Sequence, residues 1–311
     1  MSDIILHHYA SSPYSEKIRA ILGYKQLHWK SVRTPSILPK PDVVALTGGY
    51  RKAPVMQIGR DIYCDTALMA RVIDRLHSQP PLMPSAQRAS LAAFTQLEQT
   101  LFFAAVPVVF QPAGLKVVME RLGADVFEKF GRDRAALFTG GNAPRPDAEF
   151  SKIHFLPLMN ALDLQLAHCR FLLGDAPTLA DFVCWHPVWF VLSNAGVADK
   201  LAAFKHLLAW AERIRALGHG TPSELSSGDA IEIARTTTTA QAFDGPLLEP
   251  EKLKIGQRVS VSATDYGCDA VTGTLLHASV FELAIKRNDE RAGDVIVHFP
   301  RQGFRVVAAS S

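Results

Sequence analysis

The order of short apolar runs and helix-start signals in the first 76 residues limits this part of the chain to a small mixed sheet with helices on it. Residues 3–8 form a short apolar run that predicts a strand. Ser12-Pro13 then predicts the start of a helix, because Ser can cap the helix and Pro needs no N–H at the first helical position. The remaining predicted strands are 28–32, 54–58 and 61–64, and the predicted helices are 13–23, 41–46 and 65–76. The resulting order, β-α-β-α-β-β-α, has crossover connections followed by a hairpin, which favours a mixed sheet.

The apolar periodicity changes twice further along the chain. Residues 79–84 form a Pro-rich linker, and from 86 to about 217 apolar residues recur at helical spacing, interrupted by a Gly/Pro loop at 140–146. After Pro222 short runs of alternating residues punctuated by glycine predict β-strands, as in a small barrel or sandwich. We therefore predict three domains, at 1–79, 86–220 and 221–311.

Composition excludes several classes of protein. The net charge is only +3 and the Lys and Arg residues are scattered, so nucleic-acid binding is not expected. The N-terminus lacks the pattern of a signal peptide, and the longest apolar region, near 102–110, is shorter than a membrane span and contains Pro107. The four cysteines lie far apart, which predicts neither a metal site nor a disulfide scaffold and favours the cytoplasm.

Four motifs in order resemble those of glutathione transferases. They are residues 12–19 (SPYSEKIR), residues 52–55 (KAPV), Asp65-Thr66 and residues 178–181 (TLAD). The resemblance covers roughly residues 3–218 and leaves the C-terminal segment without a counterpart. It implies a thioredoxin-like glutathione-binding domain at 1–79 and an all-helical domain at 86–220. The β-rich extension at 221–311, predicted from its residue pattern, has an unknown role.

The first motif carries the expected chemistry. A thiol must ionise to become a nucleophile, and both a hydroxyl and the N-terminus of a helix favour the thiolate. The resemblance implies that Ser12 donates to the glutathione sulfur, with Ser11 as the neighbouring alternative. A plain helix cap is the structural alternative for Ser12. No cysteine lies at this turn, so disulfide exchange through an enzyme thiol is disfavoured.

The second and third motifs are expected to hold the peptide. By resemblance the Ala53–Pro54 bond is cis and exposes the Ala53 backbone to the cysteinyl part of glutathione, as in strand addition. Asp65 and Thr66 at a helix start would bind the γ-glutamyl ammonium and carboxylate, although an ordinary cap is the alternative. Lys40 and Lys52 are candidates for the glycyl carboxylate.

The helical domain is expected to supply the second pocket. By resemblance its first long helix borders the electrophile site, which makes Phe102, Phe103, Val106 and Phe110 candidate lining residues, with core packing as the alternative. Thr178 and Asp181 predict a capping box, a folding element without chemistry. His186-Pro187 is interpreted as a helix kink with a satisfied histidine, and no role is assigned to His7 or His8.

Together these features predict a transferase that activates glutathione, its cosubstrate, for attack on a hydrophobic electrophile. The alternative is a non-catalytic glutathione-binding or scaffold protein that recruits a partner through 221–311, and a weaker option is peroxide reduction or isomerisation. The resemblance also implies a homodimer with a role in detoxification. No metal, nucleic-acid or membrane partner is expected.

Overall fold

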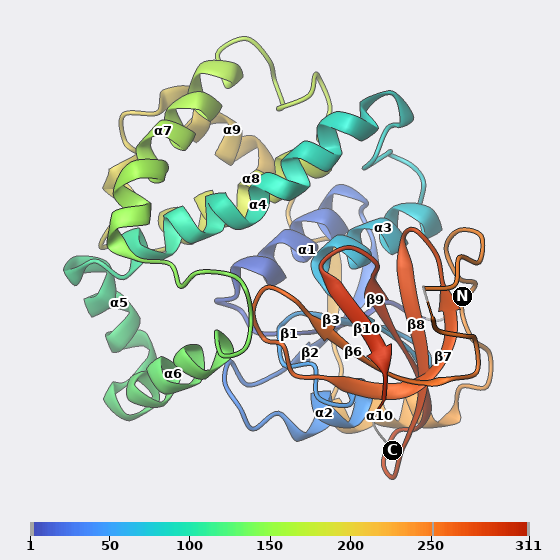
Figure 1. Cartoon of the computed structure of the whole chain (residues 1–311). Coiled ribbons are helices and arrows are strands. Elements are labelled where there is room, and N and C mark those ends of the chain that lie inside the picture. Colours follow the sequence, from blue (N-terminus) through green and yellow to red (C-terminus); the bar gives the residue numbers. More distant parts are fainter. Residues whose placement is uncertain (1–2, 251, 310–311) are drawn as a thin grey trace.

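The computed structural model describes residues 3–250 and 252–309 (Figure 1). Its strands in chain order are β1 (Ile5–His8), β2 (His28–Arg33), β3 (Val55–Ile58), β4 (Asp61–Cys64), β5 (Thr221–Glu224), β6 (Arg258–Ala263), β7 (Val271–Ala278), β8 (Glu282–Asp289), β9 (Gly293–Pro300) and β10 (Phe304–Ala308). Its α-helices are α1 (Pro13–Tyr24), α2 (Pro41–Thr47), α3 (Thr66–Leu76), α4 (Arg88–Val109), α5 (Pro112–Leu122), α6 (Ala124–Leu137), α7 (Ala148–Leu166), α8 (Leu179–Leu192), α9 (Lys205–Arg215) and α10 (Ser227–Thr236).

The strands of the described residues join in one sheet, in the order β10-β6-β7-β8-β9-β4-β3-β1-β2-β5. Its N-terminal part has the thioredoxin-like arrangement, with β1 parallel to β2 and antiparallel to β3, and with β3 and β4 as a hairpin. The element order expected for the first 76 residues is confirmed. Strands β6 to β9 and β10 pair antiparallel, which confirms the β-rich C-terminal segment.

The C-terminal segment does not form a separate module, because two of its strands pair with the N-terminal sheet. Its first strand, β5, extends the N-terminal sheet beside β2, and β9 runs parallel to β4 at the other end of that sheet. A single apolar cluster contains Leu46, Val55 and Ile62 together with Val261, Ile285 and other residues of the C-terminal strands. Sequence periodicity did not predict this attachment, because alternation along a strand says which face is apolar but not which strand it pairs with.

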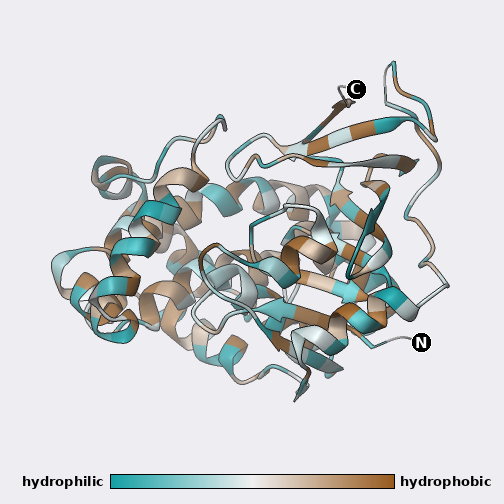
Figure 2. Ribbon diagram, turned by 90° about the horizontal axis from the view of Figure 1, so that it is seen from below, coloured by the Kyte–Doolittle hydropathy of each residue, from teal (hydrophilic) through white to brown (hydrophobic). Residues whose placement is uncertain are grey.

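The helices divide between the two faces of the sheet. Helices α1 and α3 lie between the sheet and the helical domain, and α2 and α10 lie on the opposite side (Figure 1). The apolar cluster on the first side joins Ile18 and Leu68 to Leu101 and Trp185, so the N-terminal and helical parts share a core. Seen from below, the C-terminal strands alternate in hydropathy along their length (Figure 2), as strands with one buried face should.

The helical domain is built around α4, which packs against α7 and α8. The predicted capping box at the start of α8 is confirmed: the Asp181 carboxylate accepts hydrogen bonds from the Thr178 backbone N–H at 2.9 Å and from Trp210 Nε1 at 2.9 Å. Within the described residues, one stretch, Ser85–Val109, is long and apolar enough to cross a membrane. Its buried side chains, among them Leu101 and Ala104, pack inside the domain.

Candidate functional site

Ser12 occupies the N-cap of α1, as the sequence predicts. Its backbone is extended, with φ −79° and ψ 120°, and Pro13 follows as the first helical residue. The Ser12 Oγ accepts a hydrogen bond from the Ser15 N–H at 3.2 Å, so its own proton stays available for another acceptor. Ser11 and Ser12 both line a large cleft of about 1130 Å³ between the sheet and the helical domain.

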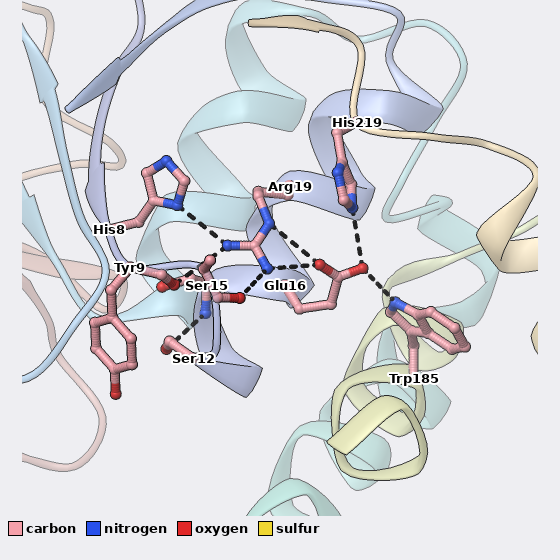
Figure 3. Close-up of polar contacts among 9 residues, drawn as sticks. His8, Tyr9, Ser12, Ser15, Glu16, Arg19, Trp185 and His219 are labelled. Atoms are coloured by element: carbon pink, nitrogen blue, oxygen red, sulfur yellow. Dashed lines mark hydrogen bonds and ion pairs between the residues drawn. The ribbon is translucent and has the colours of Figure 1, made fainter. Parts of the chain in front are cut away.

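A buried arginine fixes the loop that carries these two serines (Figure 3). Arg19 Nη2 donates to the Ala10 carbonyl at 3.0 Å and to Glu16 Oε2 at 2.7 Å, and Arg19 Nη1 lies 3.1 Å from His8 Nδ1. Because Arg19 is on α1 itself, these contacts tie the loop to the helix that it precedes. Burial and the nearby Arg19 charge lower the pKa of His8 to about 3, so His8 is neutral and its contact with Arg19 is not a repulsion.

Glu16 extends the same network to the helical domain (Figure 3). Its Oε1 accepts hydrogen bonds from Trp185 Nε1 at 3.2 Å and from His219 Nε2 at 3.0 Å. Burial opposes ionisation of Glu16, but the hydrogen bonds from His219 and Arg19 keep its pKa below the usual range. Sequence analysis treated Glu16 and Arg19 only as part of a motif. Because the two residues are three positions apart on one helix, their spacing was the signal for an ion pair.

The predicted peptide-binding elements line the same cleft. The Ala53–Pro54 bond is cis, as predicted, and Ala53, Asp65 and Thr66 line the same cleft as Ser12. Asp65 is the N-cap of α3 in a left-handed conformation, φ 74°, and its carboxylate accepts a hydrogen bond from the Ala67 N–H at 2.9 Å. Such strained non-glycine residues cluster at functional sites.

A buried charged chain that the sequence did not predict adjoins the cleft through Thr66 and Glu98. Lys17 Nζ donates to both carboxylate oxygens of Glu98, at 2.7 and 2.9 Å, and to Thr66 Oγ1 at 3.2 Å. On its other side Glu98 Oε1 lies 2.8 Å from His186 Nε2. Burial opposes ionisation of Glu98, but the Lys17 ammonium and His186 hold its pKa at about 2. The expectation of a satisfied His186 therefore holds only for Nε2, because Nδ1 is buried without a hydrogen-bond partner among the described residues.

The two candidate lysines have different environments. Lys40 Nζ donates to the Arg51 carbonyl at 3.2 Å, and no carboxylate lies within ion-pair distance of it in residues 3–250 and 252–309. Burial and the nearby Arg134 charge lower the pKa of Lys40 to about 8. Lys52 is paired instead: its Nζ lies 2.8 Å from Asp265 Oδ1.

Aromatic side chains form the other half of the cleft. Phe102 and Val106 on α4 line it, together with Phe110 directly after that helix and Phe190 on α8. Phe103, the fourth candidate, is instead buried in a small apolar cluster. Helix α6 adds Phe127 and Phe130, which sequence reasoning had not singled out.

The C-terminal segment also reaches this cleft. Thr264, Asp265 and Tyr266, in the connection from β6 to β7, are among its lining residues. The Tyr266 ring stacks on Phe138 at 5.0 Å between centroids, with 18° between the ring planes. A segment outside the four motifs that resemble glutathione transferases therefore forms part of the wall.

Comparisons with known proteins agree with this geometry. Residues 6–81 match the family model described as glutathione S-transferase, N-terminal domain, and residues 140–217 match the one described as glutathione S-transferase, C-terminal domain. A solved structure of a GST-like protein from Pseudomonas syringae is 40% identical and superposes with a TM-score of 0.82, covering 99% of this chain and 100% of that one. The chain belongs to the glutathione S-transferase family.

More distant members share the fold alone. A structure of glutathione S-transferase III in its apo form is 23% identical with a TM-score of 0.51, and covers 69% of this transferase-family chain and 92% of its own. A glutathione S-transferase from Rhodospirillum rubrum F11 is 16% identical with a TM-score of 0.52, covering 68% of this chain and 88% of its own. A comparison with curated proteins gave no match.

Proposed function

We propose that this protein is a serine-type glutathione transferase that binds glutathione in the cleft and activates its thiol for attack on a hydrophobic electrophile. The observation that carries the proposal is the Ser12 hydroxyl at the N-terminus of α1, in one cleft with Ala53, Asp65 and Thr66. The thiol proton leaves to solvent, and the Ser12 O–H and the positive end of the helix stabilise the thiolate. The thiolate then forms a C–S bond, and the leaving group departs with its electron pair.

The rest of the cleft supports the same reaction. Thr66 at the start of α3 offers a hydroxyl and backbone N–H groups to the γ-glutamyl carboxylate, while Asp65 faces the ammonium. The aromatic wall of α4, α6 and α8 suits an apolar second substrate. Holding both reactants together would add to the effect of thiol ionisation. Homodimerisation, a cytoplasmic location and a role in detoxification stay predictions from the family resemblance.

Ser12→Ala is expected to keep glutathione affinity but slow conjugation. Ser12 touches mainly the sulfur, and its O–H favours the thiolate over the thiol, so its loss should raise the pKa of the bound thiol. Removing one charge-assisted hydrogen bond costs about 1–3 kcal/mol, or roughly 5- to 150-fold in rate. The measurements are conjugation to a chlorinated nitroaromatic and the pH dependence of thiolate absorbance in the complex.

Ser15→Ala is a matched control for this test. Ser15 lies on the same helix, is buried, and its hydroxyl has no hydrogen-bond partner within the described part of the chain. It should leave the titration where it is. If Ser11→Ala shifts the titration and Ser12→Ala does not, the activating hydroxyl belongs to Ser11. If no serine variant shifts it and no conjugate forms, the proposed activity is wrong.

Lys40 should make glutathione binding weaken in alkaline solution. With a pKa of about 8 in the free protein, Lys40 loses its charge, and its attraction for a glycyl carboxylate, as the pH rises through 8. S-Methylglutathione has no thiol to titrate, so its dissociation constant isolates this effect. We expect it to rise by up to about tenfold by about pH 9.

Lys40→Arg provides the comparison, since arginine stays charged throughout this range. The ratio of the two dissociation constants removes the titration of the ligand's own amino group. Parallel pH profiles for the two proteins would assign the carboxylate to another residue.

A further inference from the structure

The connection from β6 to β7 is held firmly against the helical domain. The Asn142 N–H donates to the Thr264 carbonyl at 2.9 Å, the Ala143 N–H to the Asp265 carbonyl at 3.0 Å, and the Gly267 N–H to the Leu137 carbonyl at 2.6 Å. A Cβ on Gly141 would lie 1.8 Å from the Asp265 carbonyl oxygen, so the two backbones meet at a distance that requires glycine there. The position of Asp265 is therefore set by backbone contacts that do not depend on its side chain.

From this position the Asp265 carboxylate engages Lys52. Lys52 Nζ lies 2.8 Å from Asp265 Oδ1 and 4.2 Å from the centroid of the Tyr266 ring, so two residues of the C-terminal segment surround one ammonium group. Gln99 Nε2 donates to the other carboxylate oxygen, Oδ2, at 3.4 Å. The side chain of Lys52 is 13% exposed. A ligand carboxylate that approaches Lys52 therefore meets a cation that is already neutralised.

We propose that Asp265 is a specificity-determining residue. Its carboxylate competes with a ligand carboxylate for Lys52, and the ion pair between Asp265 and Lys52 must break before Lys52 can bind the ligand. This inference rests on the proposed function, in which Lys40 and Lys52 are the candidates for the glycyl carboxylate. The two lysines then have different roles. Lys40, whose hydrogen-bond partner is a neutral carbonyl, attracts the carboxylate first, and Lys52 contributes only as far as Asp265 releases it.

The competition also assigns a role to the segment from 221 to 311. The segment brings a carboxylate into a cleft whose other walls come from the glutathione-binding and helical parts. Burial lowers the pKa of Lys52, but the charges of Tyr266, Asp265 and Asp65 together raise it above the usual value. A ligand that places a carboxylate near Lys52 is therefore bound less tightly than one whose group near Lys52 is neutral.

The test is a thermodynamic cycle in the full-length chain with Asp265→Asn, Lys52→Met and the double variant. Asparagine keeps the shape of the side chain and leaves the backbone hydrogen bonds of the loop in place. Isothermal calorimetry with glutathione should show binding about three- to tenfold tighter for Asp265→Asn, the range expected when one partly exposed charge pair is removed. The gain should vanish when Lys52 is already methionine, and it should be absent for glutathione whose glycine carboxyl is an amide.

Three outcomes separate this proposal from the proposed function. Wild-type protein that binds glutathione while Asp265→Asn binds it equally or more weakly overturns the competition and leaves the transferase assignment intact. Binding by Asp265→Asn alone supports the competition in its strongest form. If neither protein binds at millimolar glutathione, both proposals are wrong. Asp265→Ser, which is smaller and neutral, gives the same comparison if Asp265→Asn does not fold, as judged by its thermal unfolding.

Discussion

Lys17→Met is expected to destabilise the protein by about 3–5 kcal/mol at neutral pH, because it leaves the Glu98 carboxylate buried without its cation. Lys17 is fully buried in α1, and its ammonium contacts both oxygens of Glu98 on α4. His186 stays beside Glu98 in the variant, but burial lowers its pKa, which makes it a poor replacement for an ammonium. Urea unfolding at neutral pH measures the loss.

The loss should shrink in acid. Glu98 has a folded-state pKa of about 2, below its unfolded value, so its stabilising effect is complete above about pH 4.5 and disappears as the pH falls through about 2. The difference between wild type and Lys17→Met should follow the same curve. Adding Glu98→Gln to Lys17→Met should restore part of the stability. Lys30→Met is the control, because Lys30 is 3.8 Å from Asp3 in an exposed pair, worth about 0–1 kcal/mol.

Equal losses in the two lysine variants would mean that the buried pair contributes no more than a surface pair. The same variant also reports on the site. Without the Lys17 amine, the Thr66 hydroxyl loses a hydrogen-bond donor. Glutathione binding measured on the folded fraction should therefore weaken, while Lys30→Met should leave it unchanged.

His298→Gln is expected to lower the free energy of unfolding by about 3–5 kcal/mol, because it also removes the cation from a buried ion pair. His298 on β9 is buried between two carboxylates: its Nε2 is 2.8 Å from Asp61 Oδ1 on β4, and its Nδ1 is 3.5 Å from Glu282 Oε2 on β8. Burial disfavours the imidazolium, but the two carboxylates outweigh it and raise the pKa of His298. The substitution leaves two buried carboxylates without the charge that compensates them.

The sign of the pH dependence follows from the raised pKa. The stabilisation by His298 is fully present below its unfolded pKa, about 6.5, and is lost as the pH rises through the higher folded value. Wild-type stability should therefore decline in mildly alkaline solution, and the decline should be smaller in His298→Gln. Urea unfolding across this range, with His28→Gln at the exposed start of β2 as control, measures both effects. A larger difference between the proteins at alkaline than at acid pH would contradict the assignment.

The local elements of this fold could be predicted from sequence, and their long-range partners could not. The βαβαββα order and the Thr178–Asp181 cap depend on residues close together in the chain, where periodicity and capping apply directly. Strand β5 and helix α10 were missed, because TPSE has no apolar alternation and α10 lies in a segment interpreted as β-rich. Their place is set by packing: Ala230 on α10 is buried with Ile5 and Val32 of the N-terminal sheet.

In the candidate site, too, the local motifs could be predicted from sequence and their long-range partners could not. The residues that the motifs supplied, Ser12, Ala53 and Thr66, lie in one cleft. The buried partners behind them were not predicted, because Lys17 and Glu98 meet across 81 positions of sequence. Nor did the sequence point to Asp265, which lies outside the resemblance. A charged residue on an otherwise apolar helix face, such as Glu98 on α4, was the one available signal for a buried pair.

The position of β9 beside β4 also has a consequence for synthesis on the ribosome. Strands β4 and β2 form the two edges of the N-terminal four-stranded sheet until residues near Ile296 and Thr221, respectively, have been made. A nascent thioredoxin-like domain therefore emerges with both edges unpaired, and such edges are templates for wrong pairing with other chains. Contacts this distant in sequence also slow the final step of folding. We expect the nascent chain to depend on chaperones until its last strands are released, and truncated chains ending before β9 to aggregate.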